Sequence, residues 1–360
     1  MKSFFRFIFF ILIIVLIVLG IRHFLPDFYT QQSNRAHGVY FIYQGDQALK
    51  KHKWQNAIDL YKKGLALYPE HYSAWHNLGS IYVLYEDYDS ALDAYAHAIK
   101  YNPNYICARM NYGIVSAEKF GDFDSAITQY DEIIKMKKKL LNIPWIFDNT
   151  KSTKINKGYA LYNKGLAYKN KSFYCEKDEY LLRIKYLKEA LEAYKSAIKV
   201  LKKNYEAQYN LALAYHMLGY KRDAGINYCK AIRLSPLSYE AHYNLAILLR
   251  SLRQYKESRE ELEKAAELVS FADGFSNRQN YIFEVLADVA NTMKELNEDD
   301  GQPVLDKAMI RKIAEQRYAV ETEAMLLDNF STCKSFKIFD KNFEDTENDI
   351  NFRRSINIPE

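Results

Sequence analysis

The strongest constraint on this chain is a repeat of 34 residues through its middle. Gly45, Gly79 and Gly113 stand 34 residues apart, and Ala212 and Ala246 are separated by the same distance. Four segments around these positions align: AWHNLGSIY at 74–82, ARMNYGIVS at 108–116, AQYNLALAY at 207–215 and AHYNLAILL at 241–249. Such a period is typical of stacked supersecondary units, because one unit cannot bury its apolar face alone.

Each unit has the pattern of two antiparallel helices, with apolar residues recurring at three- and four-residue spacing. We expect the small residue of the first helix, such as Gly79, to face the small residue of the second, such as Ala91, where the backbones cross closely. One recurrent position of the second helix holds Tyr61, Tyr95, Tyr130, Tyr194 and Tyr228. Prolines at Pro69, Pro103 and Pro236 end the second helix, because proline cannot continue the hydrogen-bond ladder.

These residues resemble the tetratricopeptide repeat, whose pattern is W-x-x-L-G-x-x-Y in the first helix and A-x-x-x-F in the second, followed by proline. Residues 72–105 match throughout, with Trp75, Leu78, Gly79, Tyr82, Ala91, Tyr95, Ala98 and Pro103. The resemblance implies an all-α fold, a right-handed superhelix (α-solenoid) of about six helical hairpins. We assign the six repeats to residues 38–71, 72–105, 106–140, 158–204, 205–238 and 239–272.

The remaining segments interrupt or follow the repeats. A linker is expected over 141–157, and the fourth repeat is 13 residues longer than the standard unit, with the insertion between Tyr168 and Leu187. Long connections inside compact folds are often functional, while the alternative is a lengthened hairpin that only alters the superhelix pitch. After the repeats we expect a capping helix over 273–297, a C-terminal helix within 298–330 that begins at Pro303, and a flexible tail over 331–360.

The N-terminus is strongly apolar, since Phe7 to Ile21 contains fifteen residues without a charge. Flanking apolar residues extend it towards the ~20 residues that a membrane helix needs. We therefore expect a transmembrane anchor in residues 1–25, membrane-embedded from residue 4, and a juxtamembrane linker over 26–37. A cleaved signal peptide is the alternative, but no small-x-small site follows the apolar run. Lys2 and Arg6 precede it, which favours a cytoplasmic N-terminus and translocated repeats. A composition rich in Lys, Asn, Ile and Tyr favours a bacterial inner membrane.

The sequence offers little for chemistry. A net charge of +5 without a concentrated basic stripe argues against nucleic-acid binding. The four cysteines, Cys107, Cys175, Cys229 and Cys333, lie far apart without a CxxC pair. They are expected as buried packing residues rather than as a metal site or disulfide framework. No phosphate-binding loop, HExxH or GxSxG motif occurs. We therefore predict no enzyme activity, no cofactor, no metal site and no small-molecule substrate.

A recurrent asparagine carries the binding prediction. Two residues before the small residue of the first helix, five repeats hold Asn77, Asn111, Asn163, Asn210 and Asn244. The resemblance implies that this position faces the concave groove. An asparagine amide both donates and accepts, so it can satisfy a peptide backbone irrespective of sequence. Packed helices lie about 10 Å apart, and an extended chain advances about 3.3 Å per residue. One asparagine would therefore meet the ligand backbone about every third residue. The alternative is that these asparagines serve contacts between neighbouring repeats.

The positions around the asparagines refine this hypothesis. The residue before each asparagine is His76, Met110, Tyr162, Tyr209 or Tyr243, and tyrosines offer amphipathic contact surface at low entropic cost. Repeat proteins that clamp a peptide carboxylate need a basic residue four positions before the asparagine. That position here holds Val39, Ser73, Cys107, Tyr159, Glu206 and Glu240, which disfavours such a clamp.

The predicted function is a membrane-anchored scaffold or assembly factor that binds extended peptide segments of protein partners in the groove. One alternative is a structural subunit of a membrane or envelope complex that uses the convex face and the insertion in repeat 4. Another is an accessory partner of an enzyme that acts in trans.

Overall fold

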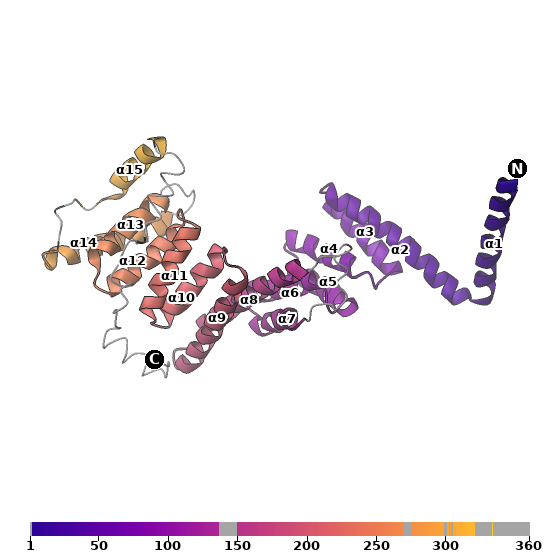
Figure 1. The fold of residues 1–360 in the computed structure, drawn as a ribbon, viewed down its shortest axis with the longest axis horizontal. Coiled ribbons are helices and arrows are strands. Elements are labelled where there is room, and N and C mark those ends of the chain that lie inside the picture. The colour runs from indigo at the N-terminus through magenta and orange to yellow at the C-terminus, as the bar shows by residue number, and fades with distance from the viewer. Residues whose placement is uncertain are drawn as a thin grey trace. The chain divides into compact units, whose positions relative to one another are not determined.

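The computed structural model describes residues 2–136, 150–269, 276–298, 301, 303, 305–320 and 333. Over these residues the fold is all helical and solenoid-like, with fifteen helices and no strand. The chain divides into two compact units, unit 1 over residues 1–136 and unit 2 over residues 137–360 (Figure 1). Each unit is built from helical hairpins stacked in sequence order.

Unit 1 contains three hairpins after its N-terminal helix α1 (Lys2–Phe24). The hairpins are α2 (Pro26–Lys50) with α3 (Trp54–Leu67), α4 (Tyr72–Leu84) with α5 (Tyr88–Tyr101), and α6 (Ile106–Lys119) with α7 (Phe123–Lys135). Successive hairpins pack through α3 on α4 and through α5 on α6. Residues 26–37, expected as a linker, form the first turns of α2, which Pro26 opens.

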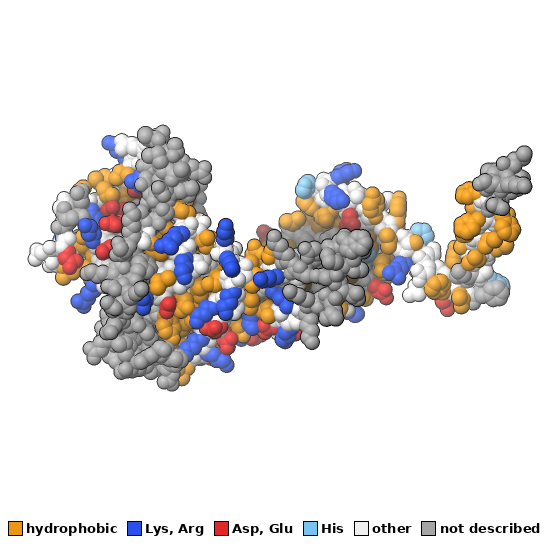
Figure 2. All heavy atoms as spheres, viewed as in Figure 1, with side chains coloured by type: hydrophobic (Ala, Val, Ile, Leu, Met, Phe, Trp, Pro, Cys, Tyr) orange, Lys and Arg blue, Asp and Glu red, His pale blue; other side chains and the backbone are white. Residues whose placement is uncertain are grey.

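Helix α1 exposes apolar side chains around its circumference, including Phe9 and Leu16, which are 66% and 67% exposed (Figure 2). The structure nevertheless does not support the expected transmembrane anchor. Among the described residues, no helix combines the length and apolar character that crossing a membrane requires.

Unit 2 contains the other three hairpins. They are α8 (Thr150–Phe173) with α9 (Tyr180–Val200), α10 (Tyr205–Met217) with α11 (Lys221–Leu234), and α12 (Tyr239–Ser251) with α13 (Tyr255–Val269). Helices α8 and α9 have 24 and 21 residues, against 13 to 15 in the four helices that follow. The insertion of repeat 4 is therefore a lengthened hairpin. Residues 150–157 of the expected linker belong to α8, and residues 141–149 lie outside the described residues.

Helix α14 (Ser276–Glu295) covers the end of the last repeat, where the capping helix was expected. It packs on α13 and buries Ile282, Leu286 and Val289 in a cluster with Leu262 of α13. Helix α15 (Lys307–Val320) also contacts α13. The prediction that Pro303 starts this helix is wrong, because Asp306 caps it by accepting a hydrogen bond from the Met309 amide at 2.8 Å. Residues 321–332 and 334–360 lie outside the described residues.

The hairpins are held together by tyrosine rings placed over glycines. Tyr61, Tyr95, Tyr130, Tyr194 and Tyr228, which share one position of the repeat, are all almost completely buried. In four repeats the glycine of the first helix lies closest to the tyrosine ring of the second, a contact that was not expected. At Gly79 the expected small residue is also adjacent, because a Cβ atom there would lie 3.2 Å from the backbone oxygen of Ala91. A Cβ atom at Gly45, Gly79, Gly113 or Gly165 would lie 2.6–2.9 Å from the ring of Tyr61, Tyr95, Tyr130 or Tyr194, respectively. Glycine is therefore required for the ring to fit.

A second recurrent contact joins three first helices, α4, α6 and α12, to the turn that precedes each of them. The Trp75 indole N–H donates to the carbonyl of Pro69 at 2.8 Å, and the Arg109 Nε donates to the carbonyl of Pro103 at 2.7 Å. His242 Nε2 makes the same contact with the carbonyl of Pro236, at 2.9 Å. Three different side chains thus use the equivalent position to satisfy a carbonyl in the turn between repeats.

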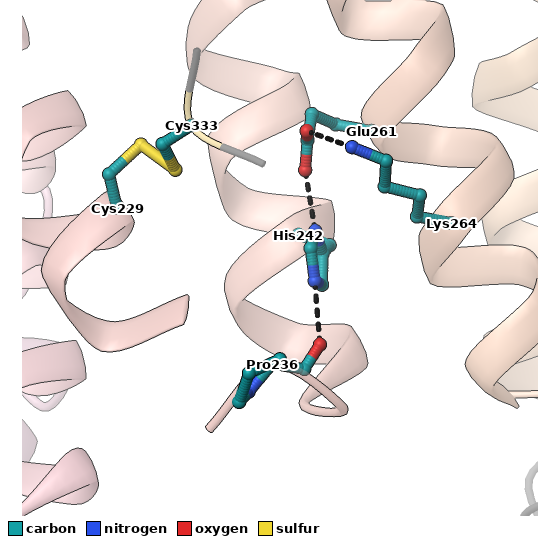
Figure 3. The surroundings of a disulfide bond; sticks show 6 residues. All are labelled: Cys229, Pro236, His242, Glu261, Lys264 and Cys333. Carbon is teal, nitrogen blue, oxygen red and sulfur yellow. Dashed lines mark hydrogen bonds and ion pairs between the residues drawn. A yellow bond between two sulfur atoms is a disulfide. The ribbon is translucent and has the colours of Figure 1, made fainter. Parts of the chain in front are cut away.

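His242 is also part of a buried charged cluster (Figure 3). Its Nδ1 lies 2.5 Å from Glu261 Oε2, and both side chains are almost fully buried. Lys264 Nζ lies 2.9 Å from the other oxygen of Glu261. Buried carboxylates need such partners, since an unpaired buried charge is costly.

The structure corrects the expectation for two cysteines. Cys229 of α11 and Cys333 form a disulfide across 104 residues of sequence (Figure 3). Cys229 is buried in the core cluster of α10 to α12, and Cys333 packs against the same cluster. The disulfide therefore fastens a residue of the expected tail to repeat 5. Cys107 and Cys175 are free thiols, and Cys107 is exposed rather than buried.

Removal of the hydroxyl group should change the free energy of unfolding differently at two of the buried tyrosines. Tyr61 Oη donates to Asp46 Oδ1 at 2.7 Å, whereas Tyr194 Oη is buried with no hydrogen-bond partner among the described residues. We expect Tyr61→Phe to lower the free energy of unfolding by about 1–3 kcal/mol, because Asp46 loses the shorter of its two hydrogen bonds and Asn77 loses an acceptor. Tyr194→Phe should leave stability unchanged or raise it. Chemical denaturation followed by circular dichroism measures both, and equal destabilisation would contradict the assignment.

Candidate functional site

The predicted groove residues lie in both units. Asn77 and His76 are on α4 and Asn111 is on α6 of unit 1, while unit 2 holds the others. In unit 2, Tyr162 and Asn163 are on α8, Tyr209 and Asn210 on α10, and Tyr243 and Asn244 on α12. All of them occupy first helices of hairpins.

In unit 1 the asparagines bind the preceding hairpin. Asn77 Nδ2 donates to Asp46 Oδ1 and to Tyr61 Oη, both at 3.3 Å. Asn111 Nδ2 donates to His76 Nε2 at 3.2 Å and to Tyr95 Oη at 3.4 Å. Burial lowers the pKa of His76. The neutral ring can thus accept from Asn111 at Nε2 while Nδ1 donates to Asn77 Oδ1 at 3.4 Å.

Unit 2 repeats this arrangement with tyrosine in place of histidine. Asn244 Nδ2 donates to Tyr209 Oη at 2.7 Å and to the carbonyl of Glu240 at 3.0 Å. Asn210 Nδ2 donates to Tyr162 Oη at 3.5 Å and to the carbonyl of Glu206 at 2.9 Å. Each asparagine therefore holds the residue that precedes the asparagine of the repeat before it.

These contacts define what the asparagines can offer to a ligand. For Asn210 and Asn244, both N–H groups are used within the protein, since an amide nitrogen has two hydrogens. Asn210 Oδ1 is also used, because it accepts from Lys169 Nζ at 2.9 Å. The geometry supports the alternative of contacts between neighbouring repeats, and peptide binding along the whole row of asparagines stays a prediction.

A pocket of about 490 Å³ lies in unit 2 where two first helices of hairpins meet the capping helix α14. Its walls come from α10, α12 and α14, and it is lined by Tyr209, Tyr239, Glu240, Tyr243, Asn244, Tyr281 and Ile282. Three of the predicted residues, Tyr209, Tyr243 and Asn244, thus come together. The other lining residues, Tyr239, Glu240, Tyr281 and Ile282, were not predicted to bind a ligand. The segments YEAQYNLA and YEAHYNLA do place the pair Tyr-Glu in both repeats, which could have pointed to Tyr239 and Glu240.

Tyrosines of the pocket contact one another and a neighbouring tyrosine of α10. The rings of Tyr243 and Tyr281 are tilted, with centroids 6.0 Å apart, and Tyr209 stacks on Tyr205 at 5.8 Å. Burial, together with its contact with Tyr281, raises the pKa of Tyr243, and burial raises that of Tyr205. The pocket therefore presents aromatic faces, and burial makes the Tyr243 hydroxyl harder to ionise than that of a free tyrosine.

Glu240 is the one carboxylate in the pocket lining. Its Oε2 accepts from Ser238 Oγ at 2.9 Å, and Ser238 Oγ in turn hydrogen-bonds to Tyr205 Oη. The carboxylate lies in the first turn of α12, where the helix N-terminus favours negative charge. Its position is thus fixed by a short chain of hydrogen bonds from α10.

Among the described residues, no group of three His, Cys, Asp or Glu side chains is arranged to hold a metal ion.

Family models of known proteins match the hairpins of both units. Profiles described as tetratricopeptide repeat match residues 44–106, 85–139 and 221–273, and a further one matches residues 205–236. The chain therefore contains tetratricopeptide repeats in both units. Proteins of this kind generally mediate protein–protein interactions.

Two relatives share part of the chain. It is 27% identical over 195 residues to a TPR repeat-containing protein of Methanocaldococcus jannaschii, covering 49% of this chain and 34% of that protein. It is 28% identical over 92 residues to a tetratricopeptide repeat-containing protein of Caenorhabditis elegans, covering 26% of this chain and 12% of that protein. The chain thus spans less than half the length of either relative.

Among solved structures, a tetratricopeptide repeat protein from Parabacteroides merdae is similar at 16% identity and a TM-score of 0.49. The match covers 82% of this chain and all of that chain.

A buried histidine of α10, His216, should make the stability of the fold depend on pH. His216 Nδ1 accepts a hydrogen bond from Tyr228 Oη at 3.2 Å, and burial, together with the charge of Lys221, lowers the His216 pKa to about 4. An unfolded histidine has a pKa of about 6.5, so the unfolded state binds more protons between these values. Stability should therefore fall as the pH decreases from 6.5 to 4, by about 3 kcal/mol from this residue.

Urea denaturation of wild type and His216→Gln at pH 7 and pH 4 measures this effect. The variant should lose less stability than the wild type on acidification. Equal losses in both proteins would show that His216 is not held neutral by the fold.

Proposed function

We propose that unit 2 binds a partner protein by taking an extended segment of it along the first helices α10 and α12 and the capping helix α14. The observation that carries this proposal is the tyrosine-lined pocket, which is wide enough for a side chain and is built from the first helices α10 and α12 and the capping helix α14. The resemblance to tetratricopeptide repeats supports it, since the first helices are expected to line the inner face of the stack.

The composition of the pocket suits protein recognition. Tyrosine supplies a large, rigid contact area at low entropic cost and is frequent among residues that dominate binding energy. Asn244 Oδ1 has no hydrogen-bond donor among the described residues, so it can accept from the backbone N–H or the side chain of a ligand. The other asparagines would act by fixing the spacing of the first helices.

The test uses the purified full chain in detergent and a phage-displayed library of random peptides. Peptides selected on wild type should bind Tyr243→Ala at least about tenfold more weakly, because a central aromatic contact is typically worth 2 kcal/mol or more. Tyr85→Ala is the matched control, since Tyr85 is an exposed tyrosine of unit 1. Equal affinity of both variants would contradict the proposal, as would a failure to select any peptide on the wild type.

A second candidate is docking through the lengthened hairpin of repeat 4, as in the structural-subunit alternative. Its tip exposes Phe173 and Leu181, which are 56% and 66% accessible. Exposed apolar side chains near one turn are a feature of contact surfaces. Phe173→Ser with Leu181→Ser would abolish this binding and leave the peptide pocket unaffected.

We also propose that residues 4–25 attach the chain to a membrane and that the repeats lie in an oxidising compartment. The exposed apolar side chains of α1 support attachment, and the positive charges of Lys2 and Arg6 support a cytoplasmic N-terminus. The disulfide between Cys229 and Cys333 supports the second part, because disulfides persist mainly outside reducing compartments.

Mass spectrometry of protein alkylated in intact cells tests the compartment. Cys229 and Cys333 should be unlabelled until a reductant is added, whereas the exposed thiol of Cys107 should be labelled directly. Labelling of all four cysteines without reduction would contradict an oxidising location. Retention in the membrane fraction after alkaline carbonate washing, lost when residues 4–25 are deleted, tests attachment.

A further inference from the structure

The repeat before the pocket contains a lysine in a closely related environment. Lys169 of α8 is partly buried, and its Nζ donates to Asn210 Oδ1 at 2.9 Å. The amide nitrogen of Asn210 holds Tyr162 Oη and the carbonyl of Glu206. An asparagine oxygen thus binds the ammonium group, and the same asparagine holds a tyrosine hydroxyl and the backbone carbonyl of the first-turn glutamate of its own helix.

The same three residue types recur one repeat later, around the pocket. Asn244 holds Tyr209 Oη and the carbonyl of Glu240 through the same pair of hydrogen bonds. Lys169 lies seven residues after Tyr162, and the residue seven after Tyr209 is His216. His216 is shorter and is hydrogen-bonded to Tyr228. Among the described residues, none donates to Asn244 Oδ1 as Lys169 donates to Asn210.

The charge in the pocket complements a cation. Glu240 lines it, and one of its oxygens, Oε2, accepts from Ser238 Oγ. No described cation forms an ion pair with Glu240. Arg250, which is near Tyr243, is already paired with Asp288 of α14. Tyrosine faces attract an ammonium group through their negative π surface, and they also pack against the methylene groups of a lysine.

We propose that the pocket takes a lysine side chain from the partner's extended segment, with its ammonium group between Asn244 Oδ1 and the Glu240 carboxylate. This inference rests on the proposed peptide binding by unit 2 and adds the chemistry of the bound residue. Lys169 shows the contact within the same chain. The partner segment would supply to Asn244 an ammonium group like the one that Lys169 of α8 supplies to Asn210.

The probes are acetylated seven-residue peptide mixtures that differ only at the central position, which is lysine, norleucine or glutamate. Binding to the full chain in detergent is measured by biolayer interferometry. The lysine mixture should bind wild type about tenfold more tightly than the norleucine mixture, which has the same methylene chain without the charge. The glutamate mixture should bind most weakly.

Three variants test whether the preference for lysine arises at Asn244 and Glu240. Glu240→Gln keeps the size of the side chain and should reduce the lysine preference to about twofold or less, while norleucine binding stays unchanged. Glu206→Gln, one repeat earlier, is the matched control and should keep the full preference. His216→Lys should place an ammonium group on Asn244 Oδ1 as Lys169 does on Asn210, and should therefore weaken binding of the lysine mixture.

The outcomes separate this inference from the proposed function. If the norleucine and lysine mixtures bind wild type equally, and both lose affinity in Tyr243→Ala, the pocket binds peptides and the lysine inference is wrong. If the lysine preference persists in Glu240→Gln but is lost in Glu206→Gln, the assigned site is wrong. If no mixture distinguishes wild type from Tyr243→Ala, the proposed function itself fails.

Discussion

The contact between a glycine of the first helix and a tyrosine ring of the second determines the rest of this structure. In four hairpins the ring lies so close that a Cβ atom would be less than 3.0 Å from it. This approach fixes the crossing of the two helices and buries the largest side chain of each repeat. The apolar faces that remain can only be covered by the next hairpin, so the stack follows from the geometry of a single unit. Repeat 5 varies the contact, with Ala212 in the cluster that contains Tyr228.

A second set of contacts, made by the asparagines, joins one repeat to the next and shapes the candidate site. Asn244 holds Tyr209 of the preceding repeat, and Asn111 holds His76. These hydrogen bonds use the donor capacity of the amides and fix the aromatic side chains along the first helices. The pocket is the place where this row meets α14, whose Tyr281 supplies the far wall. Binding surface and structural contact are therefore built from the same side chains.

The sequence predicted the parts of the fold that depend on local periodicity. The six hairpins, the recurrent tyrosine position and the capping helix were predicted from spacing, because each repeat presents the same pattern to its neighbour. The close approach of Gly79 to Ala91 was predicted, but the Tyr95 ring, which lies closer still to Gly79, was not, since a small residue is compatible with a close backbone and with a large ring. The disulfide was missed because nothing in the spacing of Cys229 and Cys333 brings them together across 104 residues.

The candidate site was predicted in part for a related reason. The pattern identified Tyr209, Tyr243 and Asn244, because they recur at one position of the repeat. It could not identify Tyr281, which lies in the non-repeating α14, or decide whether an asparagine holds a ligand or a neighbour. Both uses require the same residue on the same face of the helix.

The most direct test of the account is photocrosslinking in cells that produce the protein, with p-benzoylphenylalanine in place of Tyr281. Tyr281 is 57% exposed at the edge of the pocket, and Leu234 on α11 provides an exposed control position on a second helix. The account predicts a partner crosslinked from position 281, lost on Tyr243→Ala, and none from position 234. Crosslinks from position 234 or from Phe173, with none from 281, would contradict it.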